Sequence, residues 1–358
     1  MTQPSTNSLG RLLPRFRKAK ILVIGDLILD EFLWGKVNRI SPEAPVPVVW
    51  VQSESFMPGG AANVANNIRA LGGQVATIGV IGEDRWGSLL LHDLQSKAID
   101  TSGVVKLSRA TTVKTRVIAH HQQVVRVDRE QRERLPDGTV EQLIQQVRNR
   151  LSDVDAMIIE DYGKGVITRR LLEAIIPLAR ARRKIITVDP KQEHFDLYRR
   201  VTALTPNVAE AGEAVGRELE SDMDVERAAK DILRRLHCDA LLVTLGENGM
   251  CLFERQRRMT RIPTVAQEVF DVAGAGDTVI AAFTLALASG STMEQAARLA
   301  NHAAGIVVGK LGVAVVTPDE LHAKVAAHAS PTAPQPRTSS YPRRQLHPRQ
   351  TMRTRQSR

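Results

Sequence analysis

The sequence contains only two cysteines, Cys238 and Cys251, and their spacing is not that of metal ligands. Two isolated thiols are typical of a reduced, cytoplasmic protein rather than of a secreted protein held together by disulfides. The sequence also has no apolar run long enough to span a bilayer, and no apolar stretch follows the basic residues near the N-terminus. We therefore expect no membrane-spanning helix and no signal peptide.

Aromatic residues make up only 4% of the chain, whereas apolar residues together make up 43%. This combination is common in α/β enzymes whose cores consist of Ala, Val and Leu. A chain of 358 residues can bury such a core in one large domain or two ordinary ones.

Two familiar nucleotide-binding patterns are missing as well. The Walker pattern GxxxxGK[ST] is absent, and no GxGxxG follows the first predicted strand.

Acidic residues are absent from residues 331–358, which contain seven arginines and five prolines. These arginines account for most of the formal net charge of +10. Because the segment has almost no large apolar residues, we expect residues 329–358 to form a disordered basic tail. An inert extension and a polyanion-binding arm both remain open for the tail. Charge confined to a tail gives no reason to expect a nucleic-acid partner.

The stretch 269–290, VFDVAGAGDTVIAAFTLALASG, carries the strongest functional signal. Its second half, Thr278–Ala288, has no Gly or Pro and is predicted to be a buried helix. Unpaired N–H groups at a helix start attract anions, and glycines there let a phosphate approach closely. We therefore predict phosphoryl transfer, with Asp277 as the general base and Gly274, Ala275 and Gly276 as the anion hole. A capped turn without catalytic function is the alternative.

The sequence DVAGAGDTV around Asp277 resembles the C-terminal signature of the ribokinase-like (PfkB) family of carbohydrate kinases. Pro58–Gly72, PGGAANVANNIRALG, resembles the N-terminal signature of the same family. The resemblance implies an α/β fold with a mostly parallel sheet, helices on both faces and a small β-sheet lid. It also implies a sugar kinase that uses ATP and Mg²⁺. Whether a monovalent cation is needed as well stays undecided. We place the kinase domain at residues 20–328, after an N-terminal extension, 1–19.

Two β segments interrupt an otherwise alternating β-α pattern. Residues 32–56 are rich in proline and contain the edge strand VPVVWVQ, and residues 111–128 alternate apolar and polar side chains. The resemblance implies that they form the lid, which covers the sugar and pairs with its copy in a homodimer. From about Val140 onward, four apolar segments each end in a polar loop. They predict a parallel sheet whose loops share the edge where ligands bind.

On the sugar side, Asp30 follows the first strand, and its carboxylate can accept hydrogen bonds from hydroxyl groups. Gly59, Gly60 and Asn63 fall in the N-terminal signature, so the resemblance assigns them to sugar binding as well. A turn aspartate and a helix N-cap are the structural alternatives for Asp30 and Asn63.

The resemblance also assigns residues to the nucleotide. Asn207 and Glu210 match the NxxE motif, in which Glu210 is expected to organise Mg²⁺, although a helix capping box explains the same spacing. The remaining nucleotide-binding candidates are Lys191, Thr244, Gly246 and Asn301. For Lys191, a solvated charge on a loop is the alternative.

Three further stretches narrow the resemblance to the heptose 7-phosphate kinases of lipopolysaccharide-core biosynthesis: RISPEAPVPV at 39–48, DYGKG at 161–165 and VDPK at 188–191. We expect ATP-dependent phosphorylation of the anomeric hydroxyl, which gives the heptose 1,7-bisphosphate. Because no HxGH-type motif is present, we expect the stand-alone kinase form. Arg126 or Lys164 is predicted to hold the sugar phosphate, and Arg126 is preferred because arginine grips phosphate with two donors. The alternatives are another sugar or nucleoside kinase, such as a ribokinase or fructokinase, and a non-catalytic sugar sensor.

Overall fold

The computed structural model describes residues 9–120, 122–131, 133–255, 259–266, 268–310 and 312–328. The predicted tail therefore lies outside the described residues. Among those described, no helix is both long enough and apolar enough to cross a membrane. Cys238 and Cys251 are both buried free thiols.

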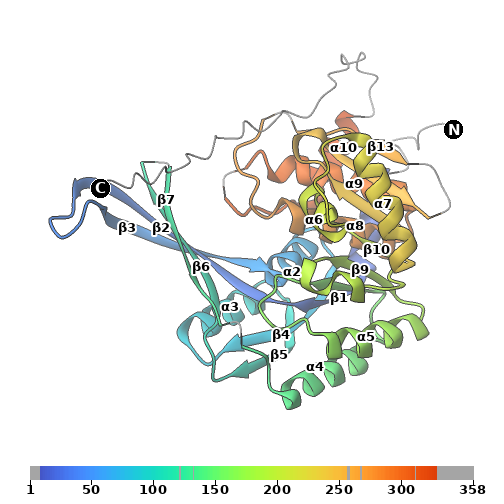
Figure 1. The fold of residues 1–358 in the computed structure, drawn as a ribbon, viewed down its shortest axis with the longest axis horizontal. Coiled ribbons are helices and arrows are strands. Elements are labelled where there is room, and N and C mark those ends of the chain that lie inside the picture. Colours follow the sequence, from blue (N-terminus) through green and yellow to red (C-terminus); the bar gives the residue numbers. More distant parts are fainter. Residues whose placement is uncertain are drawn as a thin grey trace, which may run out of the picture.

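Nine strands of the described chain form the main sheet, in the order β13-β12-β11-β10-β9-β8-β1-β4-β5 (Figure 1). Their bounds are β1 Lys20–Gly25, β4 Gln74–Gly82, β5 Asp100–Leu107, β8 Ala156–Glu160, β9 Ile185–Asp189, β10 Ala203–Leu204, β11 Ala240–Thr244, β12 Met250–Glu254 and β13 Thr260–Ile262. Neighbours from β5 to β11 pair in parallel, whereas β12 and β13 extend one end of the sheet with antiparallel pairing. The near-continuous apolar runs of β1 and β8 suit strands that are covered on both faces.

Helices cover both faces of this sheet and form two separate hydrophobic clusters. One cluster contains residues of α2 Ala61–Ala70, α3 Arg85–Ser96, α8 Ala275–Ala288, α9 Met293–Val307 and α10 Pro318–Ala327. The other contains residues of α4 Asp137–Arg150, α5 Arg169–Ala181, η2 Gln192–Leu197, α6 Val208–Ala214 and α7 Asp222–Leu236. The parallel α/β architecture predicted from the four strand-loop segments is confirmed.

Two predicted boundaries need correction. Residues 9–18 are not an extension outside the domain, because Leu9, Leu13 and Phe16 are buried in the core, and η1 Leu13–Lys18 packs on α8. The buried helix α8 begins at Ala275 rather than at Thr278. The small residues of the turn adopt helical geometry after Gly274, so Asp277 lies in the first turn of the helix.

A second, four-stranded sheet projects from the main domain (Figure 1). We call it the lid sheet, and its order is β3 Pro47–Gly60, β2 Leu27–Ile40, β6 Thr112–Ala119 and β7 Gln122–Arg129. The outer pairs are antiparallel, and β2 and β6 are parallel. As predicted, the proline-containing strand β3 lies at an edge. The lid sheet joins the core directly, since β2 starts two residues after β1 ends and β3 runs straight into α2.

Candidate active site

The carboxylate of Asp277 is held from both sides at the start of α8. Asn63 Nδ2 donates to Oδ2 at 2.6 Å, and Tyr162 Oη donates to Oδ1 at 2.6 Å. Only 5% of Asp277 is exposed. Burial raises its pKa to about 6, and the two hydrogen bonds act in the opposite direction. A carboxylate with a pKa close to neutrality is suited to accept a proton as a general base.

The turn before Asp277 leaves backbone donors free. Gly274 has φ +74° and caps α8, and a Cβ at this position would lie 2.8 Å from Asn63 Nδ2. The N–H of Ala275 is already used, because it donates to the carbonyl of Val272 at 3.2 Å. The N–H groups of Gly274, Gly276 and Asp277 make no hydrogen bond to any residue that the structure describes. These groups are therefore available as donors of the predicted anion hole, and Ala275 is the weaker member.

Asn63 lies inside α2, where it does not act as an N-cap. The cap position belongs to Gly60, which has φ +55° and makes no side-chain cap. The side chain of Asn67 donates to Asn63 Oδ1 at 3.2 Å and accepts from the Thr278 hydroxyl at 3.0 Å. This chain of amides fixes the orientation of Asn63, so that its NH₂ group faces Asp277. A helix-capping role for Asn63 is therefore wrong.

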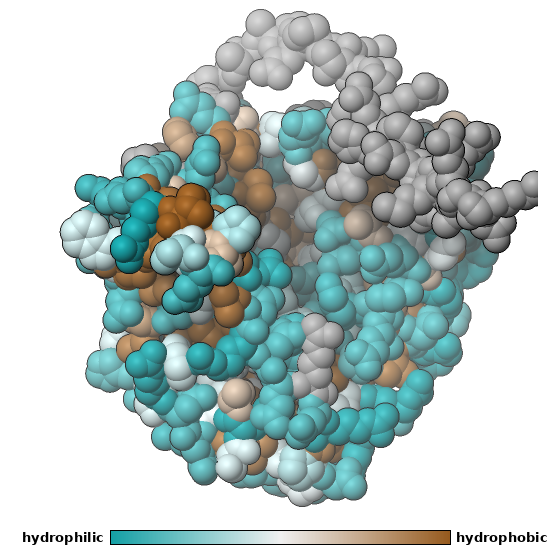
Figure 2. Space-filling view, turned by 60° about the vertical axis from the view of Figure 1, so that its left-hand side comes forward, coloured by the Kyte–Doolittle hydropathy of each residue, from teal (hydrophilic) through white to brown (hydrophobic). Residues whose placement is uncertain are grey.

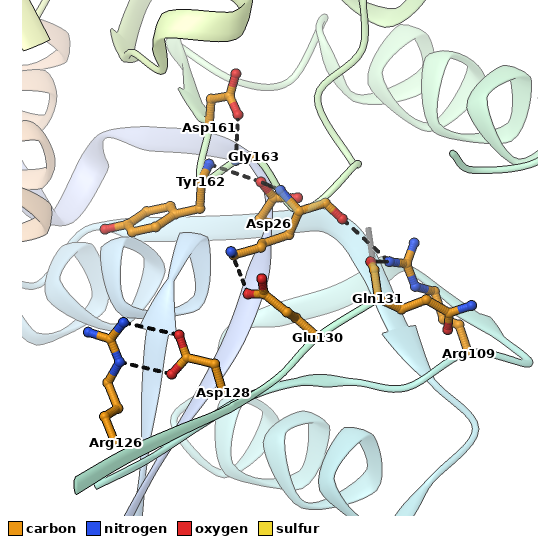
Figure 3. Close-up of polar contacts among 10 residues, drawn as sticks. Asp26, Arg109, Arg126, Asp128, Glu130, Gln131, Asp161, Tyr162 and Gly163 are labelled. Carbon is orange, nitrogen blue, oxygen red and sulfur yellow. Dashed lines mark hydrogen bonds and ion pairs between the residues drawn. The ribbon is translucent and has the colours of Figure 1, made fainter. Parts of the chain in front are cut away.

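The loop that carries Tyr162 is anchored by a buried aspartate at the end of β1. The carboxylate of Asp26 accepts the backbone N–H groups of Tyr162, Lys164 and Val166 at 2.9–3.0 Å. Figure 3 shows Asp26 facing this loop. Asp161 anchors the same loop from its other side. Its carboxylate accepts from the backbone N–H of Gly163 and from Tyr198, and it pairs with His194.

A cavity of about 200 Å³ opens beside Asp277 at the carboxyl edge of the parallel strands. The residues that line it include the predicted nucleotide-binding set Lys191, Asn207, Glu210 and Thr244, together with Gly274 and Gly276. The cavity therefore brings these predicted residues together with the base. Gly246 and Asn301 do not line it. Gly246 lies in the short helix η3 Gly246–Asn248, and Asn301 is buried and donates to the carbonyl of Pro263.

Asn207 and Glu210 form the capping box that was the structural alternative for their spacing. The side chain of each accepts the backbone N–H of the other at 3.0 Å. Glu210 Oε1 remains 3.8 Å from Lys191 Nζ, and burial raises the pKa of Glu210. The carboxylate of Glu210 offers oxygen ligands beside the cavity. This fits Mg²⁺, which prefers oxygen ligands and keeps several waters. In that case Glu210 would hold the ion, which offsets phosphate charge when bound.

The sugar-side candidates lie where the lid sheet joins the core. Asp30 is buried, and its carboxylate pairs with Arg116 Nη1 at 2.6 Å. A Cβ at Gly59 would lie 2.7 Å from Asp30 Oδ2, so glycine is what allows β3 to approach this carboxylate. Asn63 and Tyr162 connect this region to Asp277 by hydrogen bonds. We call the four candidates Asp30, Gly59, Gly60 and Asn63 the sugar wall, and Asn63 is the member that contacts Asp277.

Comparison with known proteins assigns the chain to a family. The model of the pfkB family carbohydrate kinases matches residues 18–320. The chain belongs to the pfkB family of carbohydrate kinases. The prediction of a sugar kinase is thereby confirmed, and so is the prediction of the fold. The family implies ATP as the phosphoryl donor.

Several curated relatives are named bifunctional protein HldE. That of Geotalea uraniireducens is 47% identical over 89% of this chain and 65% of its own length. That of Helicobacter pylori is 43% identical over 84% of this chain and 65% of its own length. The chain spans less than two thirds of the length of these relatives. Among solved structures, phosphofructokinase-2 from Escherichia coli has a TM-score of 0.74 at 22% identity, covering 86% of this chain and 99% of that one. A ribokinase from Thermotoga maritima has a TM-score of 0.67 at 23% identity over 86% and 99% of the two chains.

In this pfkB-family kinase the two predicted phosphate-binding residues are engaged with acids (Figure 3). Arg126, half-exposed on β7, forms a two-pronged pair with Asp128 at 2.9 and 3.1 Å. Lys164 Nζ lies 2.5 Å from Glu130 Oε2, and both side chains are largely buried. A phosphate at either residue would have to join or displace the acid. The assignment of Arg126 and Lys164 stays a prediction.

Sequence reasoning missed three side chains that lie close to Asp30 or Asp277 in this kinase: Lys114, Arg116 and Tyr162. Lys114 Nζ lies 5.6 Å from the centre of the Tyr162 ring. The signal for the two basic residues was available in the sequence. In the segment TTVKTRV they are two positions apart, which puts both on one face of a strand.

Proposed function

We propose that this kinase phosphorylates the anomeric hydroxyl of D-glycero-D-manno-heptose 7-phosphate, using ATP, and produces the heptose 1,7-bisphosphate for lipopolysaccharide-core biosynthesis. Identities of 43–47% with relatives named HldE support the choice within the family. The three stretches that resemble heptose 7-phosphate kinases support it as well. One of them, DYGKG, supplies Tyr162, which contacts Asp277.

The structural observation that carries the proposal is a cationic face on the lid sheet. In the strand register, Lys114 on β6 lies opposite Asp30 on β2, and Arg116 on β6 lies opposite Arg126 on β7. Because side chains alternate along strands, all three basic residues share one face with Asp30 and with Asp128, the partner of Lys114 on β7. We call this set, Lys114, Arg116 and Arg126, the cationic face. It adjoins the wall that contacts Asp277, so it suits a sugar that already carries a phosphate.

The electrostatics of Lys114 support the same conclusion. Burial lowers the pKa of Lys114, the negative charges of Asp30 and Asp128 raise it, and the positive charges of Lys164 and Arg126 lower it. A phosphate dianion near these groups would stabilise the charged lysine and relieve the repulsion among the cations. A neutral sugar offers no such compensation. The cationic face therefore favours a phosphorylated substrate.

Each residue at the site has a separate role in the proposed reaction. Asp277 takes the proton from the anomeric hydroxyl, whose oxygen attacks the γ-phosphorus of ATP while the bond to the β-phosphate oxygen breaks. The N–H groups of Gly276 and Asp277 stabilise charge on the transferred group. Mg²⁺ beside Glu210 would offset the charge of the nucleotide phosphates when bound. The lid excludes water, which otherwise competes for the phosphoryl group.

An ATP-consumption assay against sugars and sugar phosphates tests the proposal. We expect kcat/KM for heptose 7-phosphate to exceed that for unphosphorylated heptose by about a hundredfold, since one phosphate contact contributes about 3 kcal/mol. Arg126→Ala should raise KM for the sugar phosphate strongly and KM for ATP little. Arg148→Ala, an exposed arginine on α4, is the matched control. Efficient turnover of unphosphorylated sugars by the unaltered enzyme would disprove the heptose-phosphate assignment.

We also propose that the kinase forms a homodimer through the lid sheet. Several large hydrophobic side chains of the lid sheet are exposed: Trp50, Val51, Val125 and Val127. Figure 2, with the lid side turned forward, shows hydrophobic residues gathered on that side among polar ones. An exposed apolar sheet surface of this kind is typical of a protein–protein contact.

A further inference from the structure

The loop that carries Tyr162 to the base takes its shape from two buried carboxylates. We call residues 161–165, DYGKG, the tyrosine loop, which follows β8 directly and contains no helix or strand. The backbone N–H of Tyr162 donates to Asp26 at 2.9 Å, and that of Gly163 donates to Asp161 at 2.9 Å. A loop without regular secondary structure is held in one position by such contacts, because its backbone groups have no ladder to join. The position of Tyr162 therefore depends on Asp26 and Asp161.

Asp161 is itself held by two side chains from η2 and the residue that follows it. His194 Nδ1 lies 2.7 Å from Oδ2 of Asp161, and the Tyr198 hydroxyl donates to the same oxygen at 2.5 Å. None of the Asp161 side chain is exposed, and 13% of the His194 side chain is. An ionised carboxylate only accepts hydrogen bonds, so the His194 ring donates to it through Nδ1–H. We call His194 and Tyr198 the aspartate clamp.

The aspartate clamp stands on a firm base. Tyr198 is fully buried, and its ring lies edge-on to that of Phe195, with the ring centres 6.4 Å apart. Gln192, at the start of η2, donates to the backbone carbonyl of Glu213 on α6 at 3.0 Å. The residue before η2 is Lys191, which lines the nucleotide cavity. The clamp therefore joins the nucleotide side of the cavity to the tyrosine loop.

Electrostatics favour the donor role of both clamp residues. The hydrogen bond to Asp161 raises the pKa of His194, although burial acts in the opposite direction. Burial, followed by the charge of Asp161, raises the pKa of Tyr198, so its hydroxyl keeps its proton. With the N–H of Gly163, the buried carboxylate receives three hydrogen bonds. Removal of one donor would leave buried lone pairs unmatched, and the loop would shift to find another partner.

We infer that His194 and Tyr198 are positioning residues for phosphoryl transfer. They act through Asp161 on the tyrosine loop, whose Tyr162 hydroxyl donates to Asp277 at 2.6 Å. Neither clamp residue is among the described residues that line the nucleotide cavity, so their effect falls on kcat rather than on ATP binding. A small displacement of a reacting group is enough to slow the chemical step. The inference rests on the proposed role of Asp277 as the base, and it does not depend on which sugar is phosphorylated.

A double-mutant cycle between His194 and Tyr162 tests the inference, with whichever sugar or sugar phosphate the unaltered kinase turns over fastest. We expect His194→Ala to lower kcat about tenfold and to change KM for ATP less than about twofold. In a Tyr162→Phe background the same substitution should lower kcat less than about twofold, because the contact through which it acts is already gone. His194→Asn keeps a donor at the place of Nδ1–H and should restore kcat to within about twofold of the unaltered enzyme. His92→Ala, an exposed histidine on α3, is the matched control and should leave kcat unchanged.

Equal losses of kcat from His194→Ala in the two backgrounds would overturn the inference, since His194 would then not act through Tyr162. So would an unchanged kcat in a folded His194→Ala variant, or a His194→Asn variant as slow as His194→Ala. If His194→Ala does not fold, as judged by circular dichroism, Tyr198→Phe, which removes only a hydroxyl, is taken through the same cycle. Every rate in the cycle is measured with one sugar, so failure of the heptose assignment would leave its outcome intact. Asp277→Asn tests the role of the base separately.

Discussion

Asn63 and Asp277 are 214 residues apart in the sequence, and the amide of Asn63 lies 2.6 Å from the carboxylate of Asp277. One residue belongs to the N-terminal family signature and the other to the C-terminal signature. The two signatures therefore meet at the base, and a second hydrogen bond, from the Thr278 hydroxyl to Asn67, joins them next to it. An amide donor stabilises the ionised carboxylate, which is the form that accepts a proton.

Asp277→Asn should abolish turnover while leaving ATP affinity nearly intact. The amide keeps the size of the carboxylate but cannot take a proton, and loss of a general base costs a factor of about 10² to 10⁴ in rate. Steady-state kinetics and a nucleotide-binding titration measure the two effects separately. A variant within a fewfold of the normal rate would remove Asp277 from the mechanism.

Tyr162→Phe should lower kcat about tenfold and change KM for ATP less than about twofold. The substitution removes the hydroxyl that donates to Asp277 Oδ1, and one hydrogen bond to a charged group contributes at least about 1.5 kcal/mol. The ring and the backbone contacts of the loop with Asp26 are retained. An unchanged kcat would show that Tyr162 does not position the base.

His302→Gln should change how stability depends on pH. His302 is buried in α9, and burial, followed by the charge of His328, lowers its pKa from 6.5 to about 4. Below pH 6.5 His302 is protonated in the unfolded chain but stays neutral in the folded protein. Stability is therefore lost as pH falls from 6.5 to about 4. The loss attributable to this residue is about 3 kcal/mol.

Urea denaturation at several pH values between 7 and 4 measures this effect. The glutamine variant does not titrate, so the free energy of unfolding should fall less steeply for the variant than for the unaltered protein. Parallel curves for the two proteins would show that His302 takes up its proton in the folded state.

Trp50→Asp combined with Val127→Asp should convert the proposed lid dimer to a monomer. Both side chains are more than half exposed on the lid sheet, at 64% and 54%, and a charge there opposes an apolar contact. Sedimentation velocity reports the change. Met223→Asp, on α7 and 61% exposed, is the matched control and should leave the oligomeric state unchanged. A monomeric unaltered protein would contradict the proposal.

Local patterns were sufficient to predict the elements that carry strong periodicity. The four strand-loop segments after Val140 appear as β8 to β11, and the cavity lies at their shared edge. The Ala- and Leu-rich segment after Asp277 forms α8, although it starts three residues earlier than predicted. Boundary shifts of this size are expected where small residues adopt either turn or helix geometry.

The contacts around the base could not be read from the sequence, because they depend on register and packing between distant segments. Glu160 looks like the end of an ordinary apolar strand, and only the pairing with β9 brings it beside Asp189. Asp26 has no local partner either. Its carboxylate binds a loop 136–140 residues further along the chain, and no spacing rule reaches that far.

The direct connection between the lid sheet and the core has a mechanical consequence. β3 passes into α2 at Gly60 without an intervening linker, and Asn63 lies within the first turn of that helix. A tilt of the lid sheet would therefore move the start of α2 and, with it, the amide that holds Asp277. A sugar that draws the lid down would adjust the alignment of the base in the same movement, and an open lid would leave the base misaligned. Such coupling would protect ATP from hydrolysis when no sugar is bound.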